Sequence, residues 1–110
     1  LPEYPPLTGD ERAEVAIIGG GMTGLLTAYL LKQRGVEALV LEADRIGSGQ
    51  TGHTTAKITS QHGLIYARLL RQQGREAAAA YARANEEAIA AYEHIIAKRG
   101  ISCAFARRAA

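Results

Sequence analysis

Cysteine, tryptophan and long apolar runs are scarce or absent in this sequence of 110 residues. Cys103 is the only cysteine, so the chain can form neither an internal disulfide nor a cysteine-rich zinc site. Its apolar neighbours Ile101 and Phe105 predict an inert, buried thiol, and this cysteine usage is typical of the reducing cytoplasm. No apolar run approaches the roughly 20 residues of a membrane span, and no secretory signal pattern opens the chain. We therefore expect a cytoplasmic protein without a membrane span.

A strong excess of one charge is also missing. The formal net charge is only +2, and the arginines do not follow one stripe, so the sequence does not favour a nucleic-acid partner. No two histidines have the spacing of metal ligands, and no metal site is expected. Hydrophobic residues at 47% and charged residues at 22% are typical of one soluble globular domain.

The first half of the chain has the order strand, turn, helix, strand. The three prolines lie at positions 2, 5 and 6, which predicts an extended arm over residues 1–12. The apolar run from Val15 to Ile18 ends in three glycines and is typical of a buried parallel strand. Helical spacing follows as far as Gly35, and a second apolar run covers residues 38–41. A crossover of this length predicts two parallel strands with a right-handed connection.

The second half is predicted to be mainly helical. Residues 43–60 are polar and lack a period, so they form either a functional loop or a disordered segment. Helical spacing returns over residues 63–73, Gly74 breaks it, and a longer helix covers residues 75–99. Its apolar stripe is expected to comprise Tyr81, Ala84, Ala88, Tyr92, Ile95 and Ile96. Gly100 ends this helix, and residues 101–106 are predicted to form a strand.

A glycine-rich turn joins the first predicted strand to the first helix. The run Gly19-Gly20-Gly21-Met22-Thr23-Gly24 fits the G-x-G-x-x-G pattern of dinucleotide-binding proteins. Glu42 ends the next strand, near the expected spacing of about 20 residues. Its carboxylate can accept hydrogen bonds from ribose hydroxyls and repels a 2′-phosphate, which argues against NADP. The alternative is a turn that only packs helix on strand. The strand, helix and acid together favour nucleotide binding.

Each position of this turn has a physical reason. Gly19 permits a tight turn, Gly21 allows a pyrophosphate to approach the backbone, and Gly24 lets the helix pack closely on the sheet. Free N–H groups of Met22 and Thr23 are expected to direct the positive end of the helix dipole at the phosphates. The pattern alone leaves both FAD and NAD open. The polar loop over residues 47–57 favours FAD, because it can run along a longer dinucleotide.

Two stretches resemble the D-amino-acid oxidase and glycine oxidase superfamily of FAD enzymes: VAIIGGGMTGLLTAYLL (15–31) and LVLEADRIGSGQTGHTTAKIT (39–59). Residues 51–66 are similar to a bacterial subgroup whose members often carry a Rieske [2Fe–2S] domain at the carboxyl end. The resemblance implies FAD as cofactor, with an amino acid or amine as substrate. It implies oxidation of a C–N bond by hydride transfer to the flavin.

The motif and the resemblance together give a set of expected cofactor-binding residues. They are Gly19, Gly21, Met22, Thr23, Gly24, Glu42, Ala43, Ser48, Thr51, His53, Thr54, Thr55 and Lys57. The resemblance implies that Ser48, Thr51, Thr54 and Thr55 contact the pyrophosphate and ribityl parts. It also raises the hypothesis that His53 bonds covalently to the flavin. The alternative for His53 is a hydrogen bond to FAD or to the backbone. No catalytic residue is assigned.

The chain departs from the superfamily in lacking a substrate domain and Rieske spacing of Cys and His. The expected fold class is therefore α/β, an incomplete Rossmann-like FAD/NAD(P)-binding βαβ unit with a parallel sheet and following helices. Residues 13–110 are predicted to be the N-terminal part of an FAD-binding domain, inactive and self-associating in isolation. Any [2Fe–2S] cluster is expected only in a C-terminal part. Two alternatives stay open: an NAD-linked dehydrogenase domain and a non-catalytic nucleotide-binding module.

Overall fold

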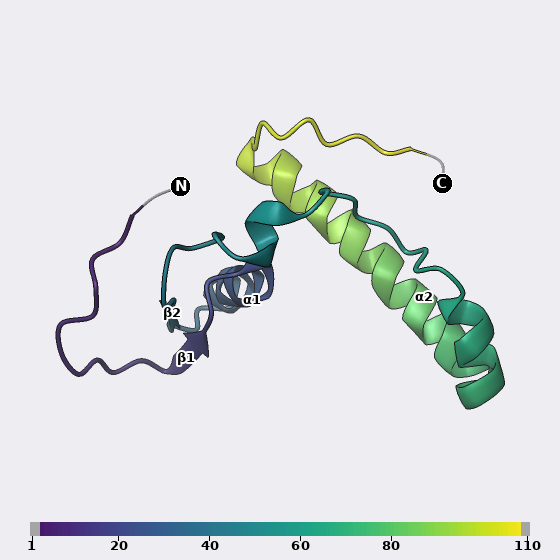
Figure 1. Ribbon diagram of the computed structural model, residues 1–110, viewed down its shortest axis with the longest axis horizontal. Helices are drawn as coiled ribbons and strands as arrows, with labels where there is room; N and C mark the ends of the chain where they lie inside the picture. The colour runs from purple at the N-terminus through teal and green to yellow at the C-terminus, as the bar shows by residue number, and fades with distance from the viewer. Residues whose placement is uncertain (1–2, 109–110) are drawn as a thin grey trace. The chain divides into compact units, whose positions relative to one another are not determined.

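The computed structural model describes residues 3–108 of the chain. In chain order it contains strand β1 (Val15–Ile18), helix α1 (Met22–Gln33), strand β2 (Ala38–Leu41), the short 3-10 helix η1 (Gln50–His53) and helix α2 (Ile65–Arg99) (Figure 1). These elements belong to two compact units, the first ending at Ala56 and the second beginning at Lys57. Residues 1 and 2 of the predicted arm and the last two residues, 109 and 110, lie outside the described part.

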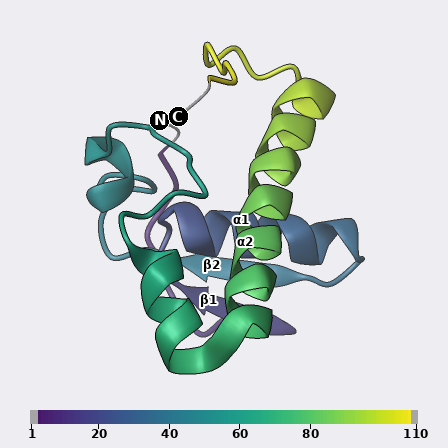
Figure 2. The same ribbon diagram turned by 90° about the vertical axis from the view of Figure 1, so that its right-hand side faces the viewer.

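The first unit is built on a parallel pair of strands. β1 and β2 run side by side in a register that pairs Val15 with Ala38 and Ile18 with Leu41. Helix α1 connects them and contacts both strands (Figure 2). A parallel pair joined by one helix is the βαβ unit. The prediction of an incomplete Rossmann-like α/β unit is therefore confirmed.

Local sequence explains where these elements begin and end. The β-branched residues at the core of β1 favour the pleated conformation over a helix. Helix α1 ends because Gly35 adopts a positive φ of 75° and donates its N–H to the Lys32 carbonyl at 3.1 Å. A sheet of two strands leaves much of its surface exposed to solvent. The Ile18 side chain at the end of β1 is 81% exposed.

Helix α2 of the second unit is a hairpin of two helical arms rather than one rod. Gly74 has φ 87° and ψ 177°, a conformation essentially limited to glycine, and it separates residues 65–73 from residues 75–99. The rings of Tyr66 and Tyr81 lie 5.9 Å apart edge to face. In a straight helix a separation of 15 residues would place them roughly 22 Å apart. Gly74 therefore breaks the helix, as the sequence predicts. The chain also reverses between the two arms (Figure 2), which the sequence did not predict.

Side chains hold the two arms and the preceding segment together. The Tyr66 hydroxyl donates to the Ser60 carbonyl at 2.6 Å, and the Tyr81 hydroxyl lies 3.1 Å from His62 Nδ1. Ala78 is the one buried hydrophobic residue among those described. Small alanines near the reversal allow the arms to approach closely. This second unit thus depends on side-chain packing, with few long-range backbone hydrogen bonds.

The half-buried face of the long arm differs in part from the prediction. Four members of the expected stripe are half-buried: Tyr81, Tyr92, Ile95 and Ile96. Ala84 and Ala88 are exposed instead. Between the two tyrosines Ala82 is half-buried, and so are Asn85 and Ile89. The latter two lie one turn and two turns after Tyr81, so they continue its face more directly than the exposed alanines do. The Asn85 amide donates to the Tyr81 carbonyl at 2.8 Å, which allows a polar residue to lie on this face.

The segment after Gly100 forms no strand, so the prediction for residues 101–106 is wrong. A strand needs a neighbouring strand to satisfy its backbone groups, and no part of residues 3–108 supplies one here. Cys103 is exposed for the same reason, which corrects the expectation of a buried thiol. Across residues 3–108, no helix is both long and apolar enough to cross a membrane.

Candidate dinucleotide-binding site

The turn after β1 requires glycine at two positions. Gly19 has a φ of +106°, which side chains disfavour. A Cβ on Gly24 would lie 2.0 Å from the carbonyl oxygen of Gly19, closer than any two such atoms can approach. The first turn of α1 therefore packs directly against the end of β1. The role predicted for Gly24, close packing of helix and strand, agrees with this geometry.

Glu42 holds the same turn from the end of β2. Its Oε2 accepts the N–H of Gly20 at 2.6 Å, and its Oε1 accepts the N–H of Asp44 at 3.1 Å. These bonds, that of Gly20 first, stabilise the charged form and hold the pKa of Glu42 below its ordinary value. The carboxylate is therefore ionised at neutral pH, and it remains exposed to a ligand.

Gly20 is also closely surrounded by other residues. It is buried, and a Cβ there would lie 3.1 Å from both Glu42 Cβ and Ile46 Cγ1. Its carbonyl accepts the N–H of Gly47 at 3.0 Å, and Gly47 has a positive φ of 75°. The backbone of the polar loop is thus tied to the glycine turn by Gly20.

One backbone N–H group at the start of α1 has a partner, although the sequence predicts it to be free. The sequence predicts a free N–H on Met22, but this group donates to Thr51 Oγ1 at 3.0 Å. Thr23 is the next residue of the first helical turn, where N–H groups have no intrahelical acceptor. Gly21 precedes them in an extended conformation, and a Cβ there would lie 3.3 Å from Thr51 Oγ1. Gly21 therefore makes room for the Thr51 hydroxyl.

The polar loop after β2 is folded by short-range bonds. The Ser48 hydroxyl donates to Asp44 Oδ2 at 3.3 Å, and η1 follows directly. His53 Nδ1 lies 2.9 Å from the Gly49 carbonyl. Thr54 Oγ1 accepts the N–H of Ala56 at 3.1 Å. These bonds give the loop a defined conformation, while its function stays a prediction.

The structure brings most of the predicted residues to one end of the sheet. Gly19 to Gly24, Glu42, Ala43 and Thr51 surround the glycine turn, and Ser48 is linked to it through Asp44. His53, Thr54 and Thr55 continue along the loop with exposed side chains. The hydrogen bond of His53 to the Gly49 carbonyl agrees with the backbone-bonded alternative. Lys57 begins the second unit and is exposed there.

Three residues of this arrangement were not predicted as functional: Gly20, Asp44 and Gly47. Gly20 fills an unspecified position of the motif, so nothing in the pattern marks its N–H as a partner of Glu42. Gly47 acts through its backbone, and Asp44 through both its backbone N–H and its carboxylate, which accepts the Ser48 hydroxyl. The one available signal was the glycine five positions after Glu42, since a positive φ in a tight loop favours glycine.

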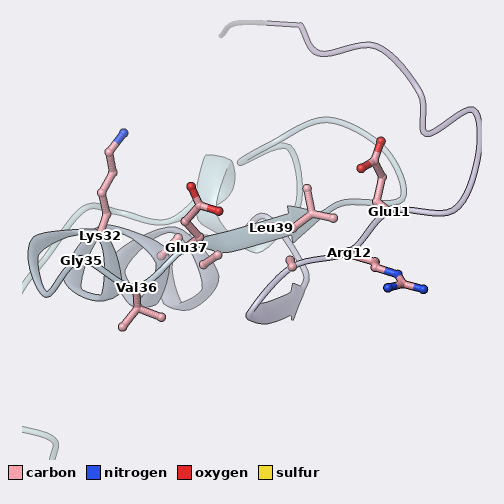
Figure 3. Close-up of a pocket in the computed structure, with 10 residues that line it drawn as sticks. Glu11, Arg12, Lys32, Gly35, Val36, Glu37 and Leu39 are labelled. Carbon is pink, nitrogen blue, oxygen red and sulfur yellow. The ribbon is translucent and has the colours of Figure 1, made fainter.

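A cavity of about 610 Å³ lies elsewhere in the first unit. Its lining includes Glu11, Arg12, Lys32, Glu37 and Leu39 (Figure 3). These residues precede β1, end α1 or begin β2, so the cavity lies at the amino ends of the strands. Ligands of parallel α/β sheets bind outside the carboxyl ends, where the glycine turn lies. We therefore assign no role to this cavity.

Comparison with known proteins agrees with this geometry. Residues 14–109 match the family model described as FAD dependent oxidoreductase. The chain belongs to this family. It is 43% identical over 103 residues to a putative Rieske 2Fe-2S iron-sulfur protein, YhfW, of Bacillus subtilis, a match that covers 94% of this chain and 20% of that protein. No solved structure matches the chain.

Two further relatives match about half of the chain. The gamma-glutamylputrescine oxidoreductase of Escherichia coli is 39% identical over 49 residues, which cover 44% of this chain and 12% of that enzyme. Human mitochondrial dimethylglycine dehydrogenase is 38% identical over 65 residues, 54% of this chain and 8% of that enzyme. The chain thus spans about one fifth or less of the length of these relatives.

Proposed function

We propose that this chain forms the adenine-dinucleotide part of the FAD site in an oxidoreductase that oxidises the C–N bond of an amino acid or amine. The observation that carries this proposal is the ionised, exposed Glu42 held at the glycine turn by the Gly20 N–H. The turn offers a helix N-terminus to phosphates, and Glu42 offers acceptors to ribose hydroxyls.

The chemical groups at the turn support the binding of an adenine dinucleotide. Gly21 has no side chain to obstruct a pyrophosphate, and the Thr23 N–H lies in the first turn of α1. Each Glu42 oxygen already accepts one backbone N–H and retains a lone pair for a hydroxyl. The loop residues Ser48, Thr54 and Thr55 would supply hydroxyls toward the ribityl chain. Ala43 and Lys57 would contact the cofactor through their backbone atoms. His53 lies on the same loop and stays a candidate for the covalent bond.

The flavin, when bound, would supply the acceptor for the hydride, and loss of that hydride would leave the neutral amine as an iminium ion. The part of this chain is to bind and orient the dinucleotide. Two relatives bear the names of enzymes acting on amines, gamma-glutamylputrescine and dimethylglycine, which supports an amine substrate class. Within residues 3–108, no three His, Cys, Asp or Glu side chains gather as a metal site. We propose that any [2Fe–2S] cluster belongs to another part of the full-length protein. We also propose that this protein is cytoplasmic.

The test is anaerobic reduction of the full-length gene product. We expect purified protein to show flavin absorbance bands that bleach when an amine or amino acid from a panel is added. Acid precipitation then distinguishes released from covalently bound flavin and decides the hypothesis for His53. A protein whose bound nicotinamide cofactor, rather than flavin, is reduced by substrate would overturn the proposal in favour of a dehydrogenase. A protein that binds nucleotide and reduces nothing would favour the non-catalytic module.

A further inference from the structure

Basic and acidic side chains of the second unit lie on different arms of the α2 hairpin. The short arm and the segment before it, residues 57–75, contain no acidic residue and four basic ones: Lys57, Arg68, Arg71 and Arg75. The acidic side chains of this unit all follow Gly74, on the long arm: Glu76, Glu86, Glu87 and Glu93. The short arm therefore presents positive charge alone.

Two of these arginines lie on the side of the short arm that faces away from the long arm. The half-buried residues of the short arm share one side of its helix: Ile65, Tyr66 and Leu69. Tyr66 packs there against Tyr81 of the long arm. Leu64, Arg68 and Arg71 follow one another at intervals of four and three residues, so they share the opposite side. All three are exposed, Leu64 by 85%, and we call them the basic face.

The basic face has no anionic partner of its own. Within residues 3–108, neither Arg68 nor Arg71 forms a salt bridge with a carboxylate. Arg71 donates its Nε–H to the Ala67 carbonyl at 3.3 Å, which leaves both Nη atoms free to donate elsewhere. Like charges three or four residues apart on a helix repel one another. A carboxylate between the two guanidinium groups would remove this repulsion.

The size and chemistry of the basic face favour one class of partner. The planar guanidinium fork matches a carboxylate, and an exposed leucine beside it supplies an apolar contact. Basic segments that bind anionic membranes generally carry about four to eight clustered cations, more than this face has. The face is only about 10 Å long, so its area is well below the roughly 1,000 Å² of a stable protein interface. An acidic protein that binds transiently fits these limits.

We propose that Leu64, Arg68 and Arg71 form a docking surface for an acidic protein that presents carboxylates around an apolar side chain. The two arginines steer the partner and pair with its carboxylates, and Leu64 packs against the apolar side chain. This surface belongs to the second unit and does not depend on the dinucleotide site of the first.

The test uses the full-length gene product and a short fluorescent peptide in which glutamates flank one leucine. We expect the double variant Arg68→Gln, Arg71→Gln to raise the dissociation constant of this peptide roughly three- to thirtyfold at low ionic strength, as loss of two exposed ion pairs does. The matched control is Arg83→Gln with Lys98→Gln, which removes the same charge from exposed positions of the long arm. It should change the constant by less than about twofold, because solvent screens distant charges.

Leu64→Ser separates apolar contact from charge. It should weaken binding of the leucine peptide and leave binding of an all-glutamate peptide unchanged. Equal losses in the two double variants, or no binding of the leucine peptide to the wild type, would overturn the proposal. Tighter binding through the basic face to vesicles of phosphatidylserine and phosphatidylcholine, or to single-stranded DNA, would overturn the choice of an acidic protein. Because flavin absorbance is read on the same samples, failure of the FAD function is distinguished from failure of this surface.

Discussion

The glycine turn of the first unit and the helical hairpin of the second are held together by different kinds of contact. In the turn, backbone atoms approach so closely that a side chain is excluded at Gly24, where a Cβ would lie 2.0 Å from the Gly19 carbonyl oxygen. In the hairpin, side chains make the contacts, with Tyr66 and Tyr81 packed edge to face across the reversal. A site defined by backbone approach tolerates no added atom. A packed helical pair tolerates changes that preserve volume.

Gly24→Ala should have the largest effect on the first unit. The added Cβ would lie 2.0 Å from the Gly19 carbonyl oxygen, so α1 must move off the end of β1. We expect a loss of about 3 kcal/mol in the free energy of unfolding, the upper end for overpacking. FAD retention should be lost with it, as measured by flavin absorbance after gel filtration.

Gly9→Ala is the control for this variant, because a Cβ there meets nothing within 4 Å. Full FAD retention by Gly24→Ala would mean that helix and strand need not touch, and would contradict the role given to the turn.

Gly74→Ala should have the next largest effect, confined to the second unit. Its space is open, but φ 87° with ψ 177° is strained for alanine, at a cost of about 1–3 kcal/mol. We expect amide protection to fall in residues 65–73 while β1 and α1 keep theirs, measured by hydrogen exchange. A similar loss of amide protection in β1 would show that the two units do not fold independently.

Glu42→Gln should have the smallest effect on stability, since the side chain is exposed, and its effect should depend on pH. The pKa of Glu42 is lowered in the folded state, chiefly by the Gly20 N–H. Its contribution is therefore present above about pH 4.5, the ordinary value, and is lost as the pH falls through the lower folded value. The wild type should lose protection of the Gly20 amide in that acid range.

In the glutamine variant the protection of the Gly20 amide should change less with pH, because this variant has no carboxylate to protonate. Glu86→Gln, on the long arm of the hairpin, serves as the charge control and should follow the wild type. Identical acid profiles for wild type and Glu42→Gln would contradict the bracing of the turn by this carboxylate.

The sequence predicted the elements whose cause is local. The apolar runs of β1 and β2 coincide with the strands, and Gly35, Gly74 and Gly100 end or break helices where a positive φ occurs. Glycine marks these positions because it alone enters such conformations at low cost. The position of Glu42 beside the glycine turn follows from the predicted parallel pairing, since pairing in register brings the carboxyl ends of both strands together.

The features that sequence reasoning missed depend mostly on residues far apart in the chain. The acceptor of the Met22 N–H is Thr51, and no local pattern identifies a partner 29 residues away. Asn85 lies on the half-buried face of the long arm although it is polar, so a search for apolar residues alone passes over it. Residues 101–106 have the composition of a strand, but within the described part they have no strand to pair with.

The most direct test of the central claim is whether the full-length gene product retains FAD through its glycine turn. Wild-type protein and Gly24→Ala are incubated with FAD, passed through a gel-filtration column, and scanned for flavin absorbance. We expect the flavin bands to elute with the wild type and to be absent from the variant. Absence of flavin from the wild type, or equal retention by both proteins, would contradict the assignment of this turn as the FAD site.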